Sequence, residues 1–417
     1  MKINGIYKFT AVAITGDILK EQEVDAASVV EDTNNLIVTE KENYWYSRGD
    51  YWGVNEEGIL TYVQGFTDEE MKNLIVPMVV EGELITGLGN NVFKDETAIN
   101  TVTIPNSVTT IGEGCFSGCT ALTSISIPNS VTTIGNNCFN GCTGLTSISI
   151  PNSVTTIGNN CFNGCTSLAS ITIPEGVTTL EGQVFYNCTS LNEINLPSTI
   201  TTFNFSYPNL QSNINVSENN KVYSSQDGVL FNKDKTELIY FPKIKEGSYI
   251  VPESVVTLSK RSFYRTNISE VTLQKNVRTI DEAFWQSKIS TINIEEGIET
   301  IGDRAFSECQ NLNIINLPSS LKTIGQAAFW HCEHVTSVTM KEGVESIGDS
   351  AFEGMHSLEN ITIPNSVTFI GEDAFGTYYH GIEIKLKNIY FAPGDNPIPE
   401  GAPWGAYNTV NIEKLTQ

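Results

Sequence analysis

The chain has 417 residues, of which 40% are hydrophobic, and it carries a formal net charge of −24. No stretch is apolar over the roughly 18 residues that a membrane helix needs. An acidic protein with a pI near 4.5 also lacks the basic surface that nucleic acid or anionic lipid requires. These properties predict no nucleic-acid partner and no direct membrane insertion.

Residues 1–56 form the first segment of the chain and match no repeat. Their alternation of apolar and polar residues predicts short strands, which we interpret as an N-terminal β cap or small domain. The segment lacks the apolar core and cleavage site of a secretory signal, so either a signal was removed, or export takes another route, or the protein stays in the cell. Five aromatic residues lie between positions 44 and 52, and Tyr and Trp are enriched at interfaces. The candidate binding residues here are Tyr44, Trp45, Tyr51 and Trp52, with packing of the cap as the alternative.

A 23-residue unit follows, and two successive copies of it are almost identical. Residues 122–144 read LTSISIPNSVTTIGNNCFNGCTG, and residues 145–167 differ only in ending on Ser167. Looser copies cover most of the chain at intervals of 21 to 23 residues, with one longer gap. A fixed period in this range predicts a solenoid, in which each coil packs on its neighbours. Each of eleven copies has a Phe at the same place, namely Phe93, Phe116, Phe139, Phe162, Phe185, Phe263, Phe284, Phe306, Phe329, Phe352 and Phe375.

Each unit predicts two short strands and a turn. Alternation over residues 122–127 indicates a strand with its Ile side chains inward and its Ser side chains outward, and Pro128 ends it because proline cannot donate to the ladder. Residues 131–134 make a second strand-like piece. Residues 136–142 are expected to form a tight helical turn that places Phe139 in the core. One unit has too little core to fold alone, so stacked units should form ladders of like residues.

The repeat divides the chain into five parts. Residues 57–202 are expected to form a first repeat block with an opening hairpin, and residues 251–376 a second block. Between them, residues 203–250 hold a degenerate unit and an Asp-Gly turn between strand-like runs, which is typical of a β-hairpin. Its expected role is to offset the two blocks, with partner binding as the alternative. Residues 377–417 are expected to cover the last coil as a C-terminal cap.

The motif L-x-x-I-x-I-P followed by V-x-x-I-G-x-x-[CA]-F-x-x-C recurs in phase from about Leu74 to Gly376 and resembles the BspA-type leucine-rich repeat. The resemblance implies a right-handed leucine-rich-repeat solenoid, predominantly β, with a parallel sheet, short helical turns and about eleven coils. It also implies adhesion to host proteins, matrix or other cells, and so an extracellular or cell-surface location. It brings no catalytic residues and no cofactor.

Cysteine is frequent, with nine in the chain, and six of them are spaced as C-x3-C in three successive units. Zinc ligation or disulfides are alternatives at this spacing. In later units, however, the first position holds Ala and the second recurs as Cys without a partner, so both positions require only a small buried residue. We therefore predict buried free thiols and no metal site. We also predict no metal site at His331–His334, because Cys332 occupies the buried position of the repeat there. The six cysteines with the C-x3-C spacing are Cys115, Cys119, Cys138, Cys142, Cys161 and Cys165.

No catalytic constellation is evident in the sequence. A Ser–His–Asp set, a phosphate-binding Gly loop and a carboxylate pair are all missing from it, so we predict that the protein is not an enzyme; a hydrolase would need a residue set that only the fold brings together. Acidic residues follow the Ile-Gly step in several units. We expect them to accept amide hydrogens at the start of the helical turn, and they are Glu113, Asp303, Asp349 and Glu372.

The outward positions of the first strand make the best-defined surface of the predicted sheet. They are small and mostly carry hydroxyl groups, which suits hydrogen bonding to a protein or glycan on a host or neighbouring cell. We therefore predict a non-enzymatic surface recognition and adhesion protein. The alternative is a passive structural spacer or phage tail accessory protein, which would belong to a virion. The candidate binding residues on this face are Ser124, Ser126, Ser147, Ser149, Ser170 and Thr172.

Overall fold

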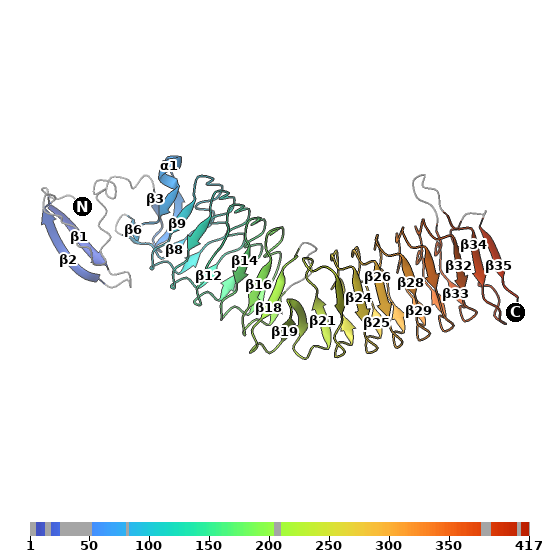
Figure 1. The fold of residues 1–417 in the computed structure, drawn as a ribbon. Coiled ribbons are helices and arrows are strands. Elements are labelled where there is room, and N and C mark those ends of the chain that lie inside the picture. The colour runs from blue at the N-terminus through green and yellow to red at the C-terminus, as the bar shows by residue number, and fades with distance from the viewer. Residues whose placement is uncertain are drawn as a thin grey trace. The chain divides into compact units, whose positions relative to one another are not determined.

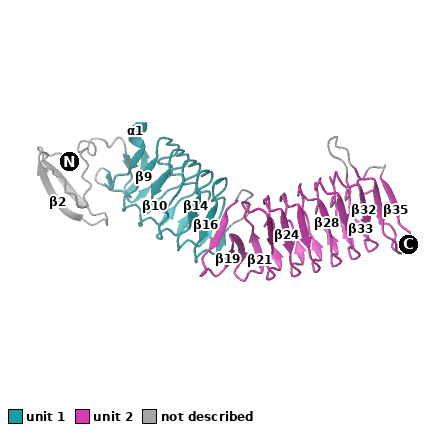
Figure 2. Ribbon diagram, viewed as in Figure 1, with its two compact units in different colours: residues 1–210 teal, residues 211–417 magenta. Residues whose placement is uncertain are grey.

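The protein folds into stacked β coils. The computed structural model describes residues 6–12, 18–25, 52–80, 83–203, 210–376, 385–406 and 410–416. It divides into two compact units, residues 1–210 (unit 1) and 211–417 (unit 2) (Figure 2). Within each unit, short strands follow one another in chain order along the stack (Figure 1). The predicted leucine-rich-repeat solenoid with parallel sheets is confirmed.

Each coil of unit 1 contributes to two parallel ladders. The long-strand ladder contains the strand that precedes the Pro of the repeat, and its members are β5 (Asn73–Ile75), β9 (Thr101–Thr103), β11 (Ser124–Ser126), β14 (Ser170–Thr172) and β16 (Glu193–Leu196). The short-strand ladder contains the strand that precedes the Phe turn, and its members are β8 (Gly87–Leu88), β10 (Thr110–Ile111), β12 (Thr133–Ile134), β13 (Thr156–Ile157), β15 (Thr179–Leu180) and β17 (Thr202–Phe203).

Antiparallel pairs and one short helix lie in the N-terminal part of unit 1. The pairs are β1 (Ile6–Val12) with β2 (Ile18–Asp25), β3 (Trp52–Val54) with β4 (Ile59–Val63), and β6 (Val79–Val80) with β7 (Glu83–Leu84). Strand β4 then pairs in parallel with β8, which joins the hairpin to the short-strand ladder. The helix α1 (Asp68–Met71) starts at a capping box, in which Thr67 accepts from the Glu70 amide and Glu70 accepts from the Thr67 amide.

Unit 2 repeats the same two ladders after an antiparallel segment. That segment is β19 (Tyr223–Gln226), β20 (Val229–Asn232) and β21 (Glu237–Tyr240), preceded by β18 (Asn213–Val216). The long-strand ladder contains β22 (Ser248–Ile250), β24 (Glu270–Leu273), β26 (Thr291–Ile294), β28 (Ile314–Asn316), β30 (Ser337–Thr339), β32 (Asn360–Ile363), β34 (Asn388–Phe391) and β35 (Asn411–Lys414). The short-strand ladder continues from β21 with β23 (Thr257–Leu258), β25 (Thr279–Ile280), β27 (Thr300–Ile301), β29 (Thr323–Ile324), β31 (Ser346–Ile347) and β33 (Phe369–Ile370).

Like residues stack on one another in the core, because every coil buries the same positions. Neighbouring Phe rings of unit 1 are parallel, as for Phe116 and Phe139, whose ring centroids lie 5.6 Å apart at 2°. In unit 2 the stack runs from Phe241 to Phe375. Parallel rings at this distance are a favourable offset arrangement. In unit 2 the last ring is met edge-on by Trp404, which is almost fully buried.

Glycine recurs after the short strand because successive coils come closest there. A Cβ built on Gly135 would lie 2.6 Å from the backbone of Gly112 and from the amide nitrogen of Glu113. The Gly135 amide also donates to the Ile111 carbonyl at 2.8 Å. Any side chain at this position would therefore force neighbouring coils apart.

The predicted short helical turns are wrong. Residues after the short strand form a series of non-helical turns, and α1 is the only helix in the described part of the chain. The physical reason is that each turn contains two residues with positive φ, such as Asn137 (53°) and Gly141 (73°), and a right-handed helix cannot continue through them. In the part of the chain that the structure describes, the solenoid has about 14 turns rather than eleven, because stacked residues such as Phe241 extend the array beyond the eleven regularly spaced Phe residues.

Candidate binding surface

The long-strand ladder places the six hydroxyl candidates on consecutive coils of unit 1, and all six side chains are exposed. Ser124 pairs with Thr101 of the preceding coil, and Ser170 with Glu193 of the following one. The middle coil joins the ladder through a single bridge between Ser126 and Ser149. The strand at residues 147–149 is therefore more weakly held than its neighbours, although its side chains stay in the same outward columns.

Two kinds of hydroxyl lie side by side on this face. Thr123 and Thr146, just before the outward strand, each donate to a backbone carbonyl of the preceding coil, at 3.1 and 3.3 Å. By contrast, the hydroxyls of Ser124, Ser126 and Ser147 make no hydrogen bond with other described residues, nor does that of Ser149. The threonines therefore hold the stack together, whereas the serines have their hydrogen-bonding capacity free.

The corresponding face of unit 2 is more varied. It carries exposed isoleucines, Ile250 (66% exposed) and Ile314 (49%), among the polar residues of the ladder. Asn388 donates to Asn360 at 2.6 Å and accepts from Asn411 at 3.4 Å, so part of this face is an amide ladder whose groups already satisfy one another. Free hydroxyls in unit 1 and paired amides in unit 2 give the two faces different chemistry.

Of the aromatic candidates near the N-terminus, the structure describes only Trp52. It lies half-buried in β3, with its ring edge-on to Phe66 at 5.2 Å and to Phe93 at 6.5 Å. Trp52 therefore covers the first ring of the Phe stack in unit 1. Tyr44, Trp45 and Tyr51 lie outside the described residues, so their role remains a prediction.

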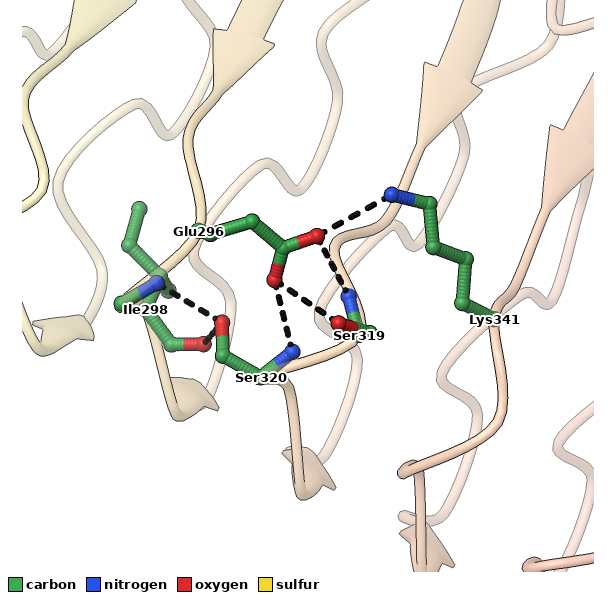
Figure 3. Close-up of polar contacts among 6 residues, drawn as sticks. Glu296, Ile298, Ser319, Ser320 and Lys341 are labelled. Atoms are coloured by element: carbon green, nitrogen blue, oxygen red, sulfur yellow. Dashed lines mark hydrogen bonds and ion pairs between the residues drawn. The ribbon is translucent and has the colours of Figure 1, made fainter.

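Glutamates beside the turns after the long strand clasp the next coil, a feature that the sequence analysis missed. Glu296 accepts hydrogen bonds from the Ser319 amide (3.1 Å), the Ser319 hydroxyl (3.0 Å) and the Ser320 amide (3.0 Å). Lys341, from the coil after that, reaches back to the same carboxylate at 3.0 Å, as Figure 3 shows. The sequence signal is a Glu-Gly pair followed 23 residues later by two small polar residues, and it recurs at Glu175 and Glu342.

The clasp holds Glu296 in its ionised form. The hydrogen bond from Lys341, followed by the one from the Ser319 amide, lowers the pKa of Glu296 to about 2. Ser320 completes the junction, because its hydroxyl accepts from the Gly297 amide at 2.9 Å and donates to the Ile298 carbonyl at 2.8 Å. The clasp is exposed and fully satisfied, so we interpret it as a structural tie between coils.

Two of the four acidic residues after the Ile-Gly step accept amide hydrogens, but not at the place expected. Asp303 accepts from the Gln326 amide at 2.8 Å, and Asp349 from the Glu372 amide at 2.9 Å, each in the following coil. The expectation that they begin a helical turn of their own coil is wrong, since no helix forms there. In unit 1 the side-chain oxygen of Asn136 accepts from the Asn159 amide of the following coil in the same way.

The nine cysteines are free and buried, which confirms the prediction of buried thiols. Their hydrogen bonding was not foreseen. The Cys142 thiol donates to the Phe116 carbonyl of the preceding coil at 3.1 Å. The same bond recurs at Cys119, Cys165, Cys188, Cys309 and Cys332. The position therefore favours a small residue with a weak donor, and Thr266 and Ser287 fill it with hydroxyls in two coils of unit 2.

Around His331, two imidazoles face one carboxylate. The Nδ1 atoms of His331 and His356 lie 3.5 and 3.9 Å from Glu333. Within the described residues no group of three or more His, Cys, Asp or Glu side chains is arranged to hold a metal ion. The described part of the chain also contains no helix with the length and hydropathy needed to cross a bilayer.

Parallel ladders, inward Ile and Phe columns and a repeat of about 23 residues define a leucine-rich-repeat solenoid. The BspA type leucine rich repeat region matches residues 86–216 and 256–380 in six copies, which is more than half of the chain. The chain belongs to this family. No curated protein matches it.

Solved structures with the same fold come from several bacteria. The pneumococcal vaccine antigen PcpA is 21% identical, with a TM-score of 0.61 over 88% of this chain and 91% of that one. A leucine-rich repeat protein from Bacteroides ovatus is 23% identical, with a TM-score of 0.57 over 87% and 97% of the two chains. Another from Eubacterium ventriosum is 24% identical, with a TM-score of 0.53 over 79% and 94%. At these identities the likeness establishes the fold alone.

Proposed function

We propose that this chain is a non-enzymatic recognition protein that acts at a cell surface or outside the cell. Its proposed partner is a protein, or a glycan, on a host or neighbouring cell. The observation that carries the proposal is the column of free serine hydroxyls on consecutive coils of unit 1. Membership of a leucine-rich-repeat family supports protein binding, and the fold shared with a pneumococcal vaccine antigen supports a surface location.

The face suits recognition because its outward residues can change without disturbing the core. Ser147 and Ser149 are exposed and their hydroxyls have no hydrogen-bond partner among the described residues, whereas inward residues such as Ile125 and Ile171 carry the packing. A partner that follows the ladder would meet hydroxyls at intervals of about 4.8 Å, the spacing of neighbouring strands. Repeated weak hydrogen bonds of this kind add specificity over a long contact.

The test is a charge substitution on this face. The wild-type chain is first screened against immobilised fibronectin, immobilised fibrinogen and a glycan array. Ser147→Arg/Ser149→Arg should abolish any saturable binding while leaving the thermal unfolding temperature within a few degrees of wild type. The matched control is Thr156→Arg/Thr179→Arg, which places the same charges at exposed positions of the short-strand ladder and should keep binding.

A structural spacer is the second candidate. The near identity of residues 122–144 and 145–167 favours it, because a spacer needs only length and repeats the same unit. If the folded wild-type chain gives no saturable binding in the screen, or if both double variants bind alike, recognition by the serine face is wrong and the spacer reading gains support.

A further inference from the structure

An aromatic ring in unit 2 lies close to two cations. Tyr264 follows Phe263 in the turn between β23 and β24. Lys243 Nζ lies 5.3 Å from the centroid of the Tyr264 ring, and Arg265 Cζ lies 5.1 Å from it. Lys243 comes from the segment between β21 and β22, so two successive coils build this cluster. Both distances are within the range of cation–π attraction.

The cluster extends along the stack to a second aromatic residue. Trp285 lies in the equivalent place of the next coil, and its ring is 5.1 Å from that of Tyr264, tilted by 51°. Arg261 lies over Trp285 at 4.9 Å, but its charge is balanced by Glu282 at 2.8 Å. Both rings are half-buried and present part of their surface to solvent.

Lys243 and Arg265 differ from Lys260 and Arg261 in their charge balance. Among the described residues, neither forms an ion pair, whereas Lys260 pairs with Asp281 at 3.0 Å. Arg265 donates instead to the neutral Gln286 amide oxygen at 2.6 Å. The pKa of Lys243 is lowered to about 8, because burial removes water from the ammonium group and because Arg265 adds a like charge.

The carboxylate of Glu308, which contacts Trp285 and Gln286, is already engaged. Glu308 accepts from the Trp285 indole nitrogen at 3.0 Å with one oxygen and from the Gln286 amide at 2.9 Å with the other. These bonds turn the Gln286 carbonyl oxygen towards Arg265. Glu308 therefore positions the cluster and leaves the positive charge of Lys243 and Arg265 for an external anion.

Arg265 has the left-handed backbone that this position of the repeat also takes with other non-glycine residues, at Asp95, Asn187, Gln286, Glu308 and His331. Its φ is +53°, and three coils of unit 1 place glycine two residues after the stacked Phe, at Gly118, Gly141 and Gly164. A non-glycine residue with this φ costs about 1 kcal/mol. Because five other coils accept the same cost at this position, the conformation belongs to the repeat, and glycine at position 265 would remove the cost.

We propose that Lys243, Tyr264 and Arg265 bind the carboxylate of an acidic segment of a partner protein. The proposal rests on the proposed function, that the chain recognises partners, and adds a site and a partner chemistry to it. The planar guanidinium of Arg265 matches a carboxylate through two parallel hydrogen bonds, and Lys243 supplies a second charge. Tyr, Trp and Arg together are the residue types that dominate binding energy at protein interfaces.

An acidic peptide fits this cluster better than a long polyanion. Of the four cations Lys243, Lys260, Arg261 and Arg265, only Lys243 and Arg265 lack an ion pair among the described residues, because Lys260 and Arg261 pair with Asp281 and Glu282. The net charge of −24 would also repel a sulfated polysaccharide along the rest of the chain. A short segment with one or two carboxylates can use the cluster without meeting that repulsion.

The test compares a variant that removes the unpaired cations with one that removes paired cations. Lys243→Gln/Arg265→Gly deletes both unpaired charges, and glycine also relieves the backbone strain, so this variant should fold at least as well as wild type. The control, Lys260→Gln/Arg278→Gln, makes the same change in net charge at cations that pair with Asp281 and Glu299. The probe is a fluorescein-labelled hexaglutamate peptide, followed by fluorescence polarisation at low salt with the full chain.

The expected result is that hexaglutamate binds wild type, that the control stays within about twofold, and that the cluster variant loses at least about tenfold, since each charged hydrogen bond contributes more than a factor of ten. Equal losses in both variants, or no binding to wild type, would overturn the proposal. Binding of a heparin hexasaccharide but not of hexaglutamate would overturn it in favour of a sulfated glycan. None of these outcomes touches the serine face of unit 1, which the matrix and glycan screen tests separately.

Discussion

The close approach of coils at Gly135 leads to a quantitative prediction for Gly135→Ala. The added Cβ would lie 2.6 Å from two backbone atoms of the preceding coil, so the coils must separate by roughly 0.8 Å to reach a tight contact of 3.4 Å. That shift stretches the hydrogen bond from Gly135 to Ile111 and loosens the stack of Phe116 on Phe139. The hydrogen bond contributes about 1 kcal/mol. A forced shift of a packed core adds about 2 kcal/mol, so we expect the free energy of unfolding to fall by about 3 kcal/mol.

The matched control is Gly141→Ala in the same coil. Gly141 has a φ of +73°, but the nearest atoms to an added Cβ are 3.8 Å away, so alanine meets backbone strain without a clash. That strain costs about 1 kcal/mol. Thermal unfolding followed by circular dichroism should show a Tm loss of roughly 6–12 °C for Gly135→Ala and roughly 2–4 °C for Gly141→Ala. If Gly141→Ala is as damaging as Gly135→Ala, or more so, close approach of the coils is not the reason for the recurring glycine.

Three further predictions concern the same stack. Ala327 has a φ of +53°, so Ala327→Gly should stabilise the protein by about 0.5–1 kcal/mol in urea unfolding, and a loss of stability would contradict the assignment of strain. Burial raises the pKa of the Cys119 thiol to about 12, so a thiol reagent at pH 8 should label the native protein slowly and all nine cysteines after denaturation; rapid labelling before unfolding would be inconsistent with buried thiols. Glu296 has a folded pKa of about 2 against an ordinary 4.5, so its contribution to stability is fully present above pH 4.5 and is lost as the pH falls towards 2. Acid unfolding of Glu296→Gln should therefore lack that part of the pH dependence, and an acid limb identical to wild type would show that the clasp contributes nothing.

The sequence predicted the coil itself well, because its rules are local. Alternation over a few residues was enough to place Ile125 inside and Ser124 outside, and the Phe period was enough to predict the stack. The buried cysteines followed from their replacement by Ala in the same position of other coils. Each of these inferences requires only the sequence of one unit and its comparison with the other units.

The features that were missed all join residues of different coils. The Cys142 thiol bonds to Phe116, 26 residues earlier, and Asp303 bonds to an amide 23 residues later. Neither contact has a local signal, so Cys142 was read as a small apolar residue and Asp303 as the start of a helix. The turn around Asn137 was predicted to be helical for the same reason: its amide donates a hydrogen bond to the Asn159 carbonyl of the next coil at 2.8 Å, and this contact has no local signal either.

Among the candidate site residues, the sequence could separate outward from inward positions but could not distinguish a free hydroxyl from a structural one. Thr146 and Ser147 are neighbours of similar chemistry, yet only Thr146 donates back to the preceding coil. The cluster around Tyr264 was not foreseen either. Lys243 and Arg265 lie 22 residues apart, in a part of the chain where the period is interrupted, so no repeat alignment brings them together.

Like-on-like packing has a consequence for how such a chain can change over time. Phe116 stacks on Phe139 and Phe139 on Phe162, so any copy of the unit can pack on any other copy through the same contacts. Duplication or loss of one 23-residue unit would therefore leave every interior contact of the same kind in place, and would lengthen or shorten unit 1 by about 4.8 Å. The almost identical residues 122–144 and 145–167 are what a recent duplication of this sort would leave behind. The number of coils can thus vary without any change in the structure of each coil. The number of serine pairs available to a partner varies with it.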